Sequence, residues 1–181
     1  MKDYRLDNDE FIFSRERGSN EDDIFNGDNG RDVYFARRGN DNLLGSWGND
    51  RLDGGPGNDG VYGGGDNDRL TGGSGNDYLA GEAGFDVITG GSGRDTFGYN
   101  AFGIFLFGGS GVDIITDFSP RGGDLIIMQI AFEFGVDNFA ELKAGMRVRN
   151  GDTHMDFGNG DDLVLRDIRP SQLHANDFLL F

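Results

Sequence analysis

The chain contains no cysteine, only two histidines and only three prolines among its 181 residues. Without cysteine there is no disulfide, no thiol nucleophile and no cysteine-ligated metal site. No H-E-x-x-H or G-x-S-x-G motif occurs, and we expect His154 and His174 to be surface residues without a chemical role. The first fourteen residues contain no apolar core of signal-peptide length, and no run approaches the roughly 20 apolar residues of a membrane span.

Basic residues are also scarce, since 16 Lys and Arg stand against 32 Asp and Glu and the formal net charge is −16. This charge excludes nucleic acid and an anionic membrane surface as the main partner, because both require a basic face. Glycine is abundant, at 33 residues, but it does not recur at every third position, which excludes collagen. Acidic, glycine-rich chains are often disordered, and disorder is therefore the first alternative to test.

An internal repeat argues against disorder. From Gly18 the sequence divides into nine consecutive units of nine residues, which end at Gly98 without a gap. Position eight is apolar in every unit, and position one is glycine in every unit except that of Ala36. Position six is always aspartate: Asp23, Asp32, Asp41, Asp50, Asp59, Asp68, Asp77, Asp86 and Asp95. Residues 99–107 lose the pattern, and a tenth unit with Asp113 begins at Gly108 in the same frame.

Each unit predicts a very short strand with one inward apolar side chain, followed by a glycine-rich turn. Two units then make one coil of 18 residues, and neighbouring coils pair as parallel strands about 4.8 Å apart. Because unit n stacks on unit n+2, the aspartates form two columns. We expect an Asp23 column of Asp23, Asp41, Asp59, Asp77, Asp95 and Asp113. The second, the Asp32 column, contains Asp32, Asp50, Asp68 and Asp86.

Stacked carboxylates at strand spacing repel one another unless a cation lies between them. Carboxylate and carbonyl oxygens are hard ligands that select calcium, whereas magnesium prefers a tight octahedron with retained waters. The apolar core of each coil is small compared with the chain entropy lost on ordering it. We therefore expect the coils not to hold together without calcium.

The units match the nonapeptide G-G-x-G-x-D-x-U-x, and the chain resembles the RTX (repeats-in-toxin) calcium-binding proteins over residues 18–116. This resemblance implies an all-β fold, a parallel β-roll (a two-sheet right-handed β-helix), that binds about six to eight calcium ions. It also implies that each ion takes the aspartates of two stacked turns, carbonyls from positions two and four of one turn, and carbonyls from positions one and three of the next. Asp59 and Asp77 would then share an ion with the carbonyls of Gly55, Gly57, Gly72 and Ser74. The other glycines expected around the ions are Gly54, Gly63, Gly64, Gly73, Gly75, Gly81, Gly84, Gly90 and Gly93.

Beyond Thr116 the glycine content falls and longer apolar side chains appear. Residues 117–130 indicate a strand pair around a Pro-Gly turn, and Asn150-Gly151 indicates a hairpin. We further expect Asp137-Asn138 to cap a short helix that Gly145 ends, a turn at Asp161-Asp162 before another strand, and Ser171 to cap a last turn. These elements predict a β-rich cap that covers the open end of the roll.

The chain accordingly divides into an N-terminal capping segment (1–17), the calcium-binding roll (18–116, with the irregular unit 99–107) and a C-terminal cap (117–181). The ending Asp177-Phe178-Leu179-Leu180-Phe181 resembles the uncleaved signals of RTX proteins exported by type I secretion. The resemblance thus implies a secreted, extracellular protein that meets the type I secretion machinery.

Three functions fit this sequence. The first is a calcium-dependent secretion and folding module, which the sequence favours. The second is a polysaccharide-binding module, like the alginate-binding R-modules of mannuronan epimerases, or an adhesive module attached to an upstream enzyme. Arg51 and Arg69 on one sheet, with Tyr62 and Tyr78 on the other, are the residues that suggest it. The third, an enzyme, is not expected, because the sequence offers no set of nucleophile and base and no zinc motif.

Overall fold

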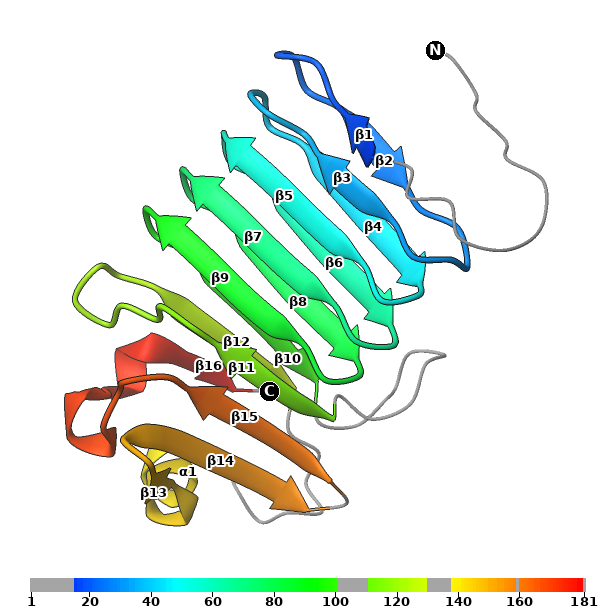
Figure 1. Ribbon diagram of the computed structural model, residues 1–181. Helices are drawn as coiled ribbons and strands as arrows, with labels where there is room; N and C mark the ends of the chain where they lie inside the picture. The colour runs from blue at the N-terminus through cyan, green and yellow to red at the C-terminus, as the bar shows by residue number, and fades with distance from the viewer. Residues whose placement is uncertain (1–14, 101–110, 130–137, 159, 181) are drawn as a thin grey trace.

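The structure is a computed structural model that describes residues 15–100, 111–129, 138–158 and 160–180. Two sheets run the length of the molecule and face each other (Figure 1). The nine-stranded sheet has the order β1 (Arg15–Arg17), β3 (Val33–Phe35), β5 (Arg51–Pro56), β7 (Arg69–Ser74), β9 (Val87–Ser92), β11 (Val112–Ile115), β15 (Asp161–Leu165), β14 (Asp152–Gly158) and β13 (Arg147–Arg149). The seven-stranded sheet has the order β16 (Phe178–Leu180), β12 (Leu125–Gln129), β10 (Thr96–Asn100), β8 (Tyr78–Ala83), β6 (Gly60–Gly65), β4 (Asn42–Trp47) and β2 (Ile24–Asn26).

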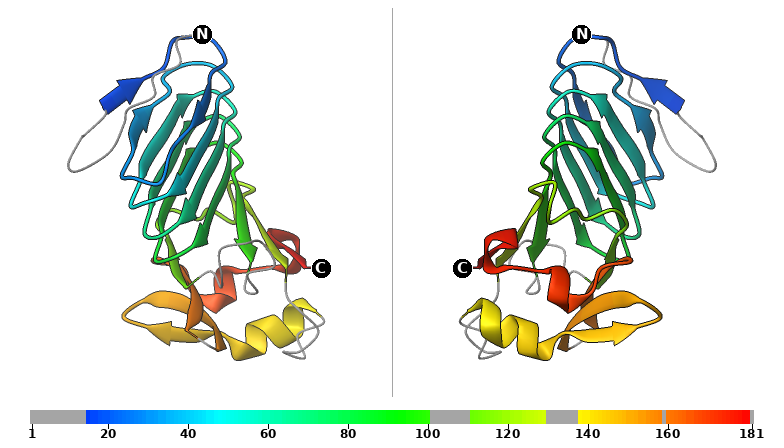
Figure 2. Two further views of the ribbon diagram at one scale, coloured as in Figure 1. Left: turned by 90° about the vertical axis from the view of Figure 1, so that its right-hand side faces the viewer. Right: turned by 90° about the vertical axis from the view of Figure 1, so that its left-hand side faces the viewer.

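The chain alternates between the sheets, so each pair of strands makes one coil (Figure 2). Leu52 pairs with Leu70, and Leu43 pairs with Val61, in parallel ladders offset by one coil of two units. Position-eight side chains point between the sheets; Leu52 and Leu70, for example, are 0% exposed. The predicted parallel β-roll and its stacking of unit n on unit n+2 are confirmed.

The turns between the sheets need glycine where successive coils touch. Gly75 has a φ of +131°, a left-handed conformation that L-residues disfavour. A Cβ atom at Gly75 would also overlap the carbonyl oxygen of Gly57 in the preceding coil. The same relation recurs at Gly93, which lies against the carbonyl oxygen of Gly75. The glycines therefore set how closely the coils stack.

After β10 the strands still alternate between the two sheets, but the sequence spacing between stacked strands is no longer 18 residues. β11 pairs with β9, so that Ile115 lies beside Ile88, and β12 pairs with β10, so that Ile126 lies beside Phe97. The expected strand pair within residues 117–130 is wrong, because β12 is the one strand in the described part of this segment and residues 117–124 form bends and turns. The expected place of Asp113 in the Asp23 column is also wrong. Asp113 instead follows Asp86, which lies 27 positions before it, whereas the regular columns step by 18 positions. Residues 101–107 of the irregular unit lie outside the described residues.

The C-terminal strands extend both sheets. Helix α1 (Phe139–Gly145) begins at Asn138, whose side chain accepts from the amides of Ala140 and Glu141. Asp137, the other expected cap, lies outside the described residues. The predicted hairpin is confirmed: β13 and β14 are antiparallel, and Asn150 and Gly151 have φ angles of 54° and 102°.

Two 3-10 helices, Pro170–Gln172 and Ala175–Asp177, precede β16. The expected cap at Ser171 is wrong, because Ser171 lies inside the first of them, where the Arg169 amide donates to Oε1 of Gln172 at 2.8 Å.

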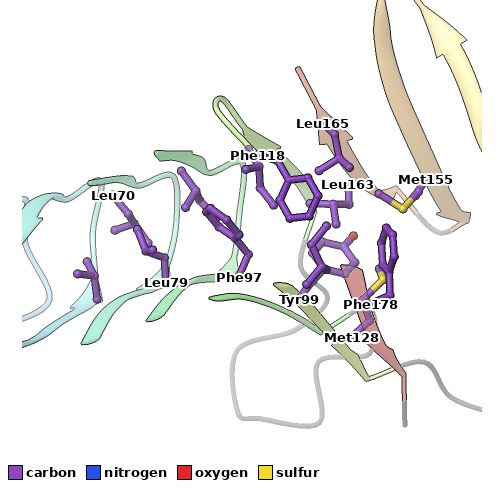
Figure 3. Close-up of a cluster of buried hydrophobic side chains, with 14 of the residues drawn as sticks. Leu70, Leu79, Phe97, Tyr99, Phe118, Met128, Met155, Leu163, Leu165 and Phe178 are labelled. Carbon is purple, nitrogen blue, oxygen red and sulfur yellow. The ribbon is translucent and has the colours of Figure 1, made fainter. Parts of the chain in front are cut away.

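Aromatic side chains fill the C-terminal end of the roll (Figure 3). The ring centroids of Phe97 and Phe118 lie 6.0 Å apart, and those of Tyr99 and Phe157 lie 5.3 Å apart. At the other end, β1 pairs with β3, while residues 1–14 of the expected capping segment lie outside the described part. Within the described residues, no helix is both long and apolar enough to span a bilayer.

Candidate metal centre

Each position-six aspartate lies at the end of a turn, directly before a strand, and is directed between two stacked turns. The Asp23 column in the structure consists of Asp23, Asp41, Asp59, Asp77, Asp95 and Asp124. The Asp32 column consists of Asp32, Asp50, Asp68, Asp86 and Asp113. All of these except Asp23 are at most 8% exposed.

In each column, every carboxylate after the first has one oxygen held by the preceding coil. The amide of Asp59 donates to Oδ1 of Asp77 at 2.9 Å, and the amide of Asp50 donates to Oδ1 of Asp68 at 2.8 Å. The bond recurs along both columns, always from the earlier aspartate to the later one. It fixes the orientation of every carboxylate and leaves its Oδ2 atom for another partner.

Six of these Oδ2 atoms are buried and have no hydrogen-bond donor: those of Asp41, Asp50, Asp59, Asp68, Asp77 and Asp86. They face other acceptors instead. A Cβ atom on Gly63 would overlap Oδ2 of Asp68 and lie 2.7 Å from the carbonyl oxygen of Gly81 in the next coil. Gly72 stands in the same relation to Oδ2 of Asp77 and the carbonyl oxygen of Gly90. Carboxylate and carbonyl oxygens thus converge without a proton between them, which is an environment that suits a cation.

The aspartates at the column ends differ. Oδ2 of Asp23 accepts from the amide of Ser19 at 2.7 Å, and Oδ2 of Asp32 accepts from the amide of Asp28 at 3.1 Å. At the far end of the Asp23 column, Oδ2 of Asp124 accepts from the amide of Ser119 at 2.8 Å. These three end carboxylates therefore have donors within their own turns, whereas the six interior Oδ2 atoms named above have none.

Burial perturbs the interior carboxylates strongly. It raises the pKa of Asp50 and Asp59 to about 7 and that of Asp68 to about 8, against the opposing effect of their amide hydrogen bonds. Burial likewise raises the pKa of Asp77 to about 6. Like-charged neighbours in the same columns add to each of these shifts. A nearby cation would act in the opposite direction, since it favours the charged form.

The donor set is made of oxygens. Among the described residues, no three carboxylate or imidazole side chains are grouped to hold an ion by themselves, so a bound cation needs backbone carbonyls as well. The structure brings Gly54, Gly63, Gly72, Gly81 and Gly90 against the carboxylates of their own turns, and it stacks Gly55, Gly57, Gly73 and Gly75 coil upon coil. Several carboxylate and carbonyl oxygens without imidazole or sulfur match the preference of calcium.

Two functional positions escaped the sequence analysis. Asp124 continues the Asp23 column through the bond from the Asp95 amide to its Oδ1, at 3.0 Å. Asp117 accepts from the amides of Gly90 and Gly91 at 2.9 and 2.8 Å. The spacing Asp124-x-Ile126 repeats the D-x-U of the units, and this signal could have identified Asp124. Nothing in the repeat marks Asp117.

The region expected to form a turn at Asp161-Asp162 begins β15 instead. Oδ1 of Asp161 accepts from the amide of Gly111 at 2.8 Å, two residues before Asp113, so Asp161 lies out of register with the Asp32 column. Asp162 pairs with Nδ1 of His154 at 2.8 Å, and His154 is half-buried, which corrects its expected surface position. The side chain of His174 is 72% exposed, as expected.

The comparisons with known proteins agree with this geometry. The model of the RTX calcium-binding nonapeptide repeat matches in four copies, at residues 17–43, 26–61, 44–79 and 71–101. No curated protein matches the chain in sequence.

Among solved structures, the chain is similar to the extracellular lipase LipA from Serratia marcescens (TM-score 0.46, 16% identity), over 91% of this chain and 39% of that chain. It is also similar to the AlgE6R3 subunit of the Azotobacter vinelandii mannuronan C5-epimerase (TM-score 0.31, 22% identity), over 90% of this chain and 80% of that chain. The chain thus spans well under half of the length of the lipase. Residues 17–101 match the RTX calcium-binding nonapeptide repeat, and over this stretch the chain is similar to RTX proteins.

Proposed function

We propose that this protein is a calcium-dependent folding module, which leaves the cell unfolded through a type I exporter and folds outside on binding several calcium ions. The observation that carries the proposal is the set of six buried Oδ2 atoms without a donor. Buried charges without partners are strongly destabilising, so the roll requires a cation to be stable at neutral pH.

Each interior ion position combines residues of two coils. For the turns 54–59 and 72–77, the ligands would be the carboxylates of Asp59 and Asp77 with the carbonyls of Gly55, Gly57, Gly72 and Ser74. Calcium supplies the positive charge that these oxygens lack. Affinities of about 10⁻⁴–10⁻³ M, typical of extracellular calcium modules, would suffice outside the cell and leave the sites empty in the cytoplasm.

The proposed C-terminal signal supports export in the unfolded state. Phe178 of β16 pairs with Ile126 of β12 and is 7% exposed, with its ring centroid 5.3 Å from that of Phe139. Once the roll is folded, the start of the signal is thus a strand of the seven-stranded sheet. An exporter that reads the Asp177–Phe181 segment would do so before the sheet forms, and folding outside would prevent return.

Far-ultraviolet circular dichroism during a calcium titration tests the folding step, with magnesium as the matched control. We expect a largely disordered spectrum in calcium-free buffer, a cooperative change to β-structure at submillimolar to millimolar calcium, and little effect of magnesium. A β-spectrum that is already complete without calcium would contradict the proposal.

Export is tested separately, by the fraction of the chain released from cells that carry a type I exporter. Removal of residues 177–181 should abolish release, whereas Asp156→Asn, which changes an exposed carboxylate on β14, should leave release unchanged. Release that persists without residues 177–181 would remove the secretion part of the proposal and leave the calcium-dependent folding intact.

A second candidate function is polysaccharide binding, favoured by Tyr62 and Tyr78. Their ring centroids lie 5.5 Å apart on the outer face of the seven-stranded sheet, while the paired Arg51 and Arg69 lie on the opposite sheet. The apolar residue Leu44 lies beside Tyr62 in the neighbouring strand β4. Calorimetric titration tests this function. The calcium-loaded protein and its variant Tyr62→Ala are each titrated with neutral glycans and with alginate. Heats of binding that Tyr62→Ala does not change would exclude this surface.

A further inference from the structure

Two turns of the Asp32 column carry acidic residues at positions where several other turns have glycine. Asp66 is at position four of the turn 63–68, and Glu82 is at position two of the turn 81–86. Both have a left-handed backbone, with φ angles of 73° and 74°. Glycine would adopt this conformation at lower cost, and strained residues of this kind are concentrated at functional sites.

The two turns are stacked directly on each other. Glu82 pairs with Gly64 across β6 and β8, and a Cβ atom on Gly84 would overlap the carbonyl oxygen of Asp66. The amide of Asp68 donates to Oδ1 of Asp86 at 2.8 Å, which joins the turns from the inside. Asp66 and Glu82 therefore belong to the same pair of turns as the two column aspartates.

This pair of turns also contains two of the six buried unpartnered carboxylates, and that of Asp86 is the most deeply buried of the six. Asp68 is 3% exposed and Asp86 is 0% exposed, and Oδ2 of each has no donor. Oδ2 of Asp68 and the carbonyl oxygen of Gly81 converge beside Gly63. Four carboxylates thus serve one ion position, two inside it and two at its rim.

Acidic residues in other turns are offset or lie within their own turn. The turn 18–23 has Glu21 and Asp22 next to its column aspartate, but the turn 36–41 that stacks on it carries two arginines. Position two of the turn 36–41 is Arg37, a cation, which also has a left-handed backbone (φ 85°). Position two of the turn 45–50 is Ser46, which is neutral. Asp28 is the acid at position two of the turn 27–32, and its Oδ1 accepts from the amide of Gly30 at 2.7 Å within its own turn.

We propose that the ion position between the turns 63–68 and 81–86 binds calcium most tightly, so that it fills first and the roll folds outward from it. The inference rests on the proposed calcium-dependent folding. The affinity of a calcium site rises with the number of its carboxylates, and attraction from rim charges adds to it. Because each coil contacts only its neighbours, an ordered central pair lowers the cost of ordering the next turn on either side.

The chain contains its own probe for this position. Trp47 is the only tryptophan, and a Cβ atom on Gly65 would lie 2.6 Å from its Cε3 atom, so the indole packs against the turn 63–68. Terbium, which occupies calcium sites, emits when a nearby indole is excited. Under tryptophan-selective excitation, terbium emission therefore reports the two ion positions on either side of the turn 63–68 ahead of distant ones.

The test is a terbium and calcium titration of the full chain and of the double variant Asp66→Asn, Glu82→Gln. These changes keep the shape of the side chains and remove their charge. We expect tryptophan-sensitised emission to appear with the first equivalent in the unmodified chain, and the first binding constant to fall about tenfold in the variant. Asp28→Asn is the matched control and should change that constant less than about twofold.

A second variant separates charge from strain. The double variant Asp66→Gly, Glu82→Gly removes the backbone strain at both left-handed positions. If the two acids have only a structural role, this variant should fold at a lower calcium concentration than the unmodified chain. Our inference expects the first ion to bind more weakly in this variant too. An unchanged or tighter first binding constant in both double variants, with calcium-dependent folding intact, would overturn the inference alone. Absence of any ion binding by the unmodified chain would instead overturn the proposed function.

Discussion

The Asp59 amide and the Asp77 carboxylate join two successive coils, with 2.9 Å between the amide nitrogen and Oδ1. The amide of Asp77 in turn donates to Oδ1 of Asp95 at 3.0 Å. Each interior aspartate thus acts as acceptor to the coil before it and as donor to the coil after it. Its other oxygen, Oδ2, is the one that a calcium ion would share between turns.

The first prediction concerns Asp77→Ala and Asp32→Ala. Asp77 lies between two turns and should contribute to two ion positions, whereas Asp32 ends its column and already bonds the Asp28 amide through Oδ2. We expect Asp77→Ala to reduce the calcium stoichiometry by two ions and Asp32→Ala by one at most, as measured by calorimetry. Equal losses would contradict the stacked columns. Asp77→Asn keeps an acceptor for the Asp59 amide, so its loss of calcium isolates the role of the charge.

The second prediction concerns pH in calcium-free buffer. The folded-state pKa values of Asp50, Asp59 and Asp68 lie near 7 to 8, far above the value of about 3.9 in an unfolded chain. Groups with a raised pKa stabilise the fold below the unfolded value, and this stabilisation is lost as pH rises through the folded values. We therefore expect acidification from pH 8 to pH 5 to restore β-structure to the calcium-free chain, measured by circular dichroism after dialysis.

In the presence of calcium the pH dependence of folding should be reversed, so that β-structure is lost on acidification, because protons compete with the ion for the same oxygens. Asp68→Asn removes the group with the highest pKa of the three, and with it the cost of ionising a buried carboxylate at that position. Its calcium-free transition should therefore shift to higher pH, whereas the exposed control Asp156→Asn should not shift it. A calcium-free chain that loses structure between pH 8 and pH 5 would refute the sign of the prediction.

The repeat was sufficient to predict the roll because every unit has the same local pattern of apolar, glycine and aspartate positions. The inward position eight, the turn glycines and the aspartate at position six all recur, and the structure places Leu52 beside Leu70 as the period requires. Asp113 shows where the frame stops being informative. The tenth unit keeps the nine-residue phase of the repeat, but its strand β11 joins the nine-stranded sheet instead of the seven-stranded one. The phase alone does not show to which sheet the next strand is added.

The elements that close the roll were predictable only in part. Asn150-Gly151 and Asn138 act locally, through a turn and a cap, and the sequence identified both. Asp117 acts on the amides of Gly90 and Gly91, which are remote in sequence, so no local signal marks it. The pair of His154 with Asp162 likewise depends on the antiparallel register of β14 and β15.

The third prediction concerns Gly75→Ala. The new methyl group would overlap the carbonyl oxygen of Gly57, and the φ of +131° disfavours any L-residue. We expect the calcium-loaded protein to lose at least about 2 kcal/mol of unfolding free energy, measured by urea denaturation at fixed free calcium. Gly145→Ala is the control, since no atom outside its immediate chain neighbours lies within 4 Å of its Cβ position, and its stability should change by less than about 1 kcal/mol. Similar stabilities for the two variants would show that the coils can separate to admit a methyl group.

The last prediction concerns Asp117, which ends a ladder. Its two oxygens accept from the amides of Gly90 and Gly91, at 2.9 and 2.8 Å, at the turn where the regular stacking of units stops. Hydrogen bonds to a charged group contribute about 1.5–3 kcal/mol each. Because the two bonds share one carboxylate, Asp117→Ala should lower the unfolding free energy of the calcium-loaded protein by about 2–4 kcal/mol. Asp117→Asn keeps one acceptor oxygen and should lose about half as much. Amide hydrogen exchange locates the effect: exchange at Gly90 and Gly91 should accelerate in Asp117→Ala, while the Asp59 amide, bonded to Asp77 in the interior, should keep its protection relative to global unfolding. If both glycine amides stay protected in Asp117→Ala, the carboxylate is not what closes this turn.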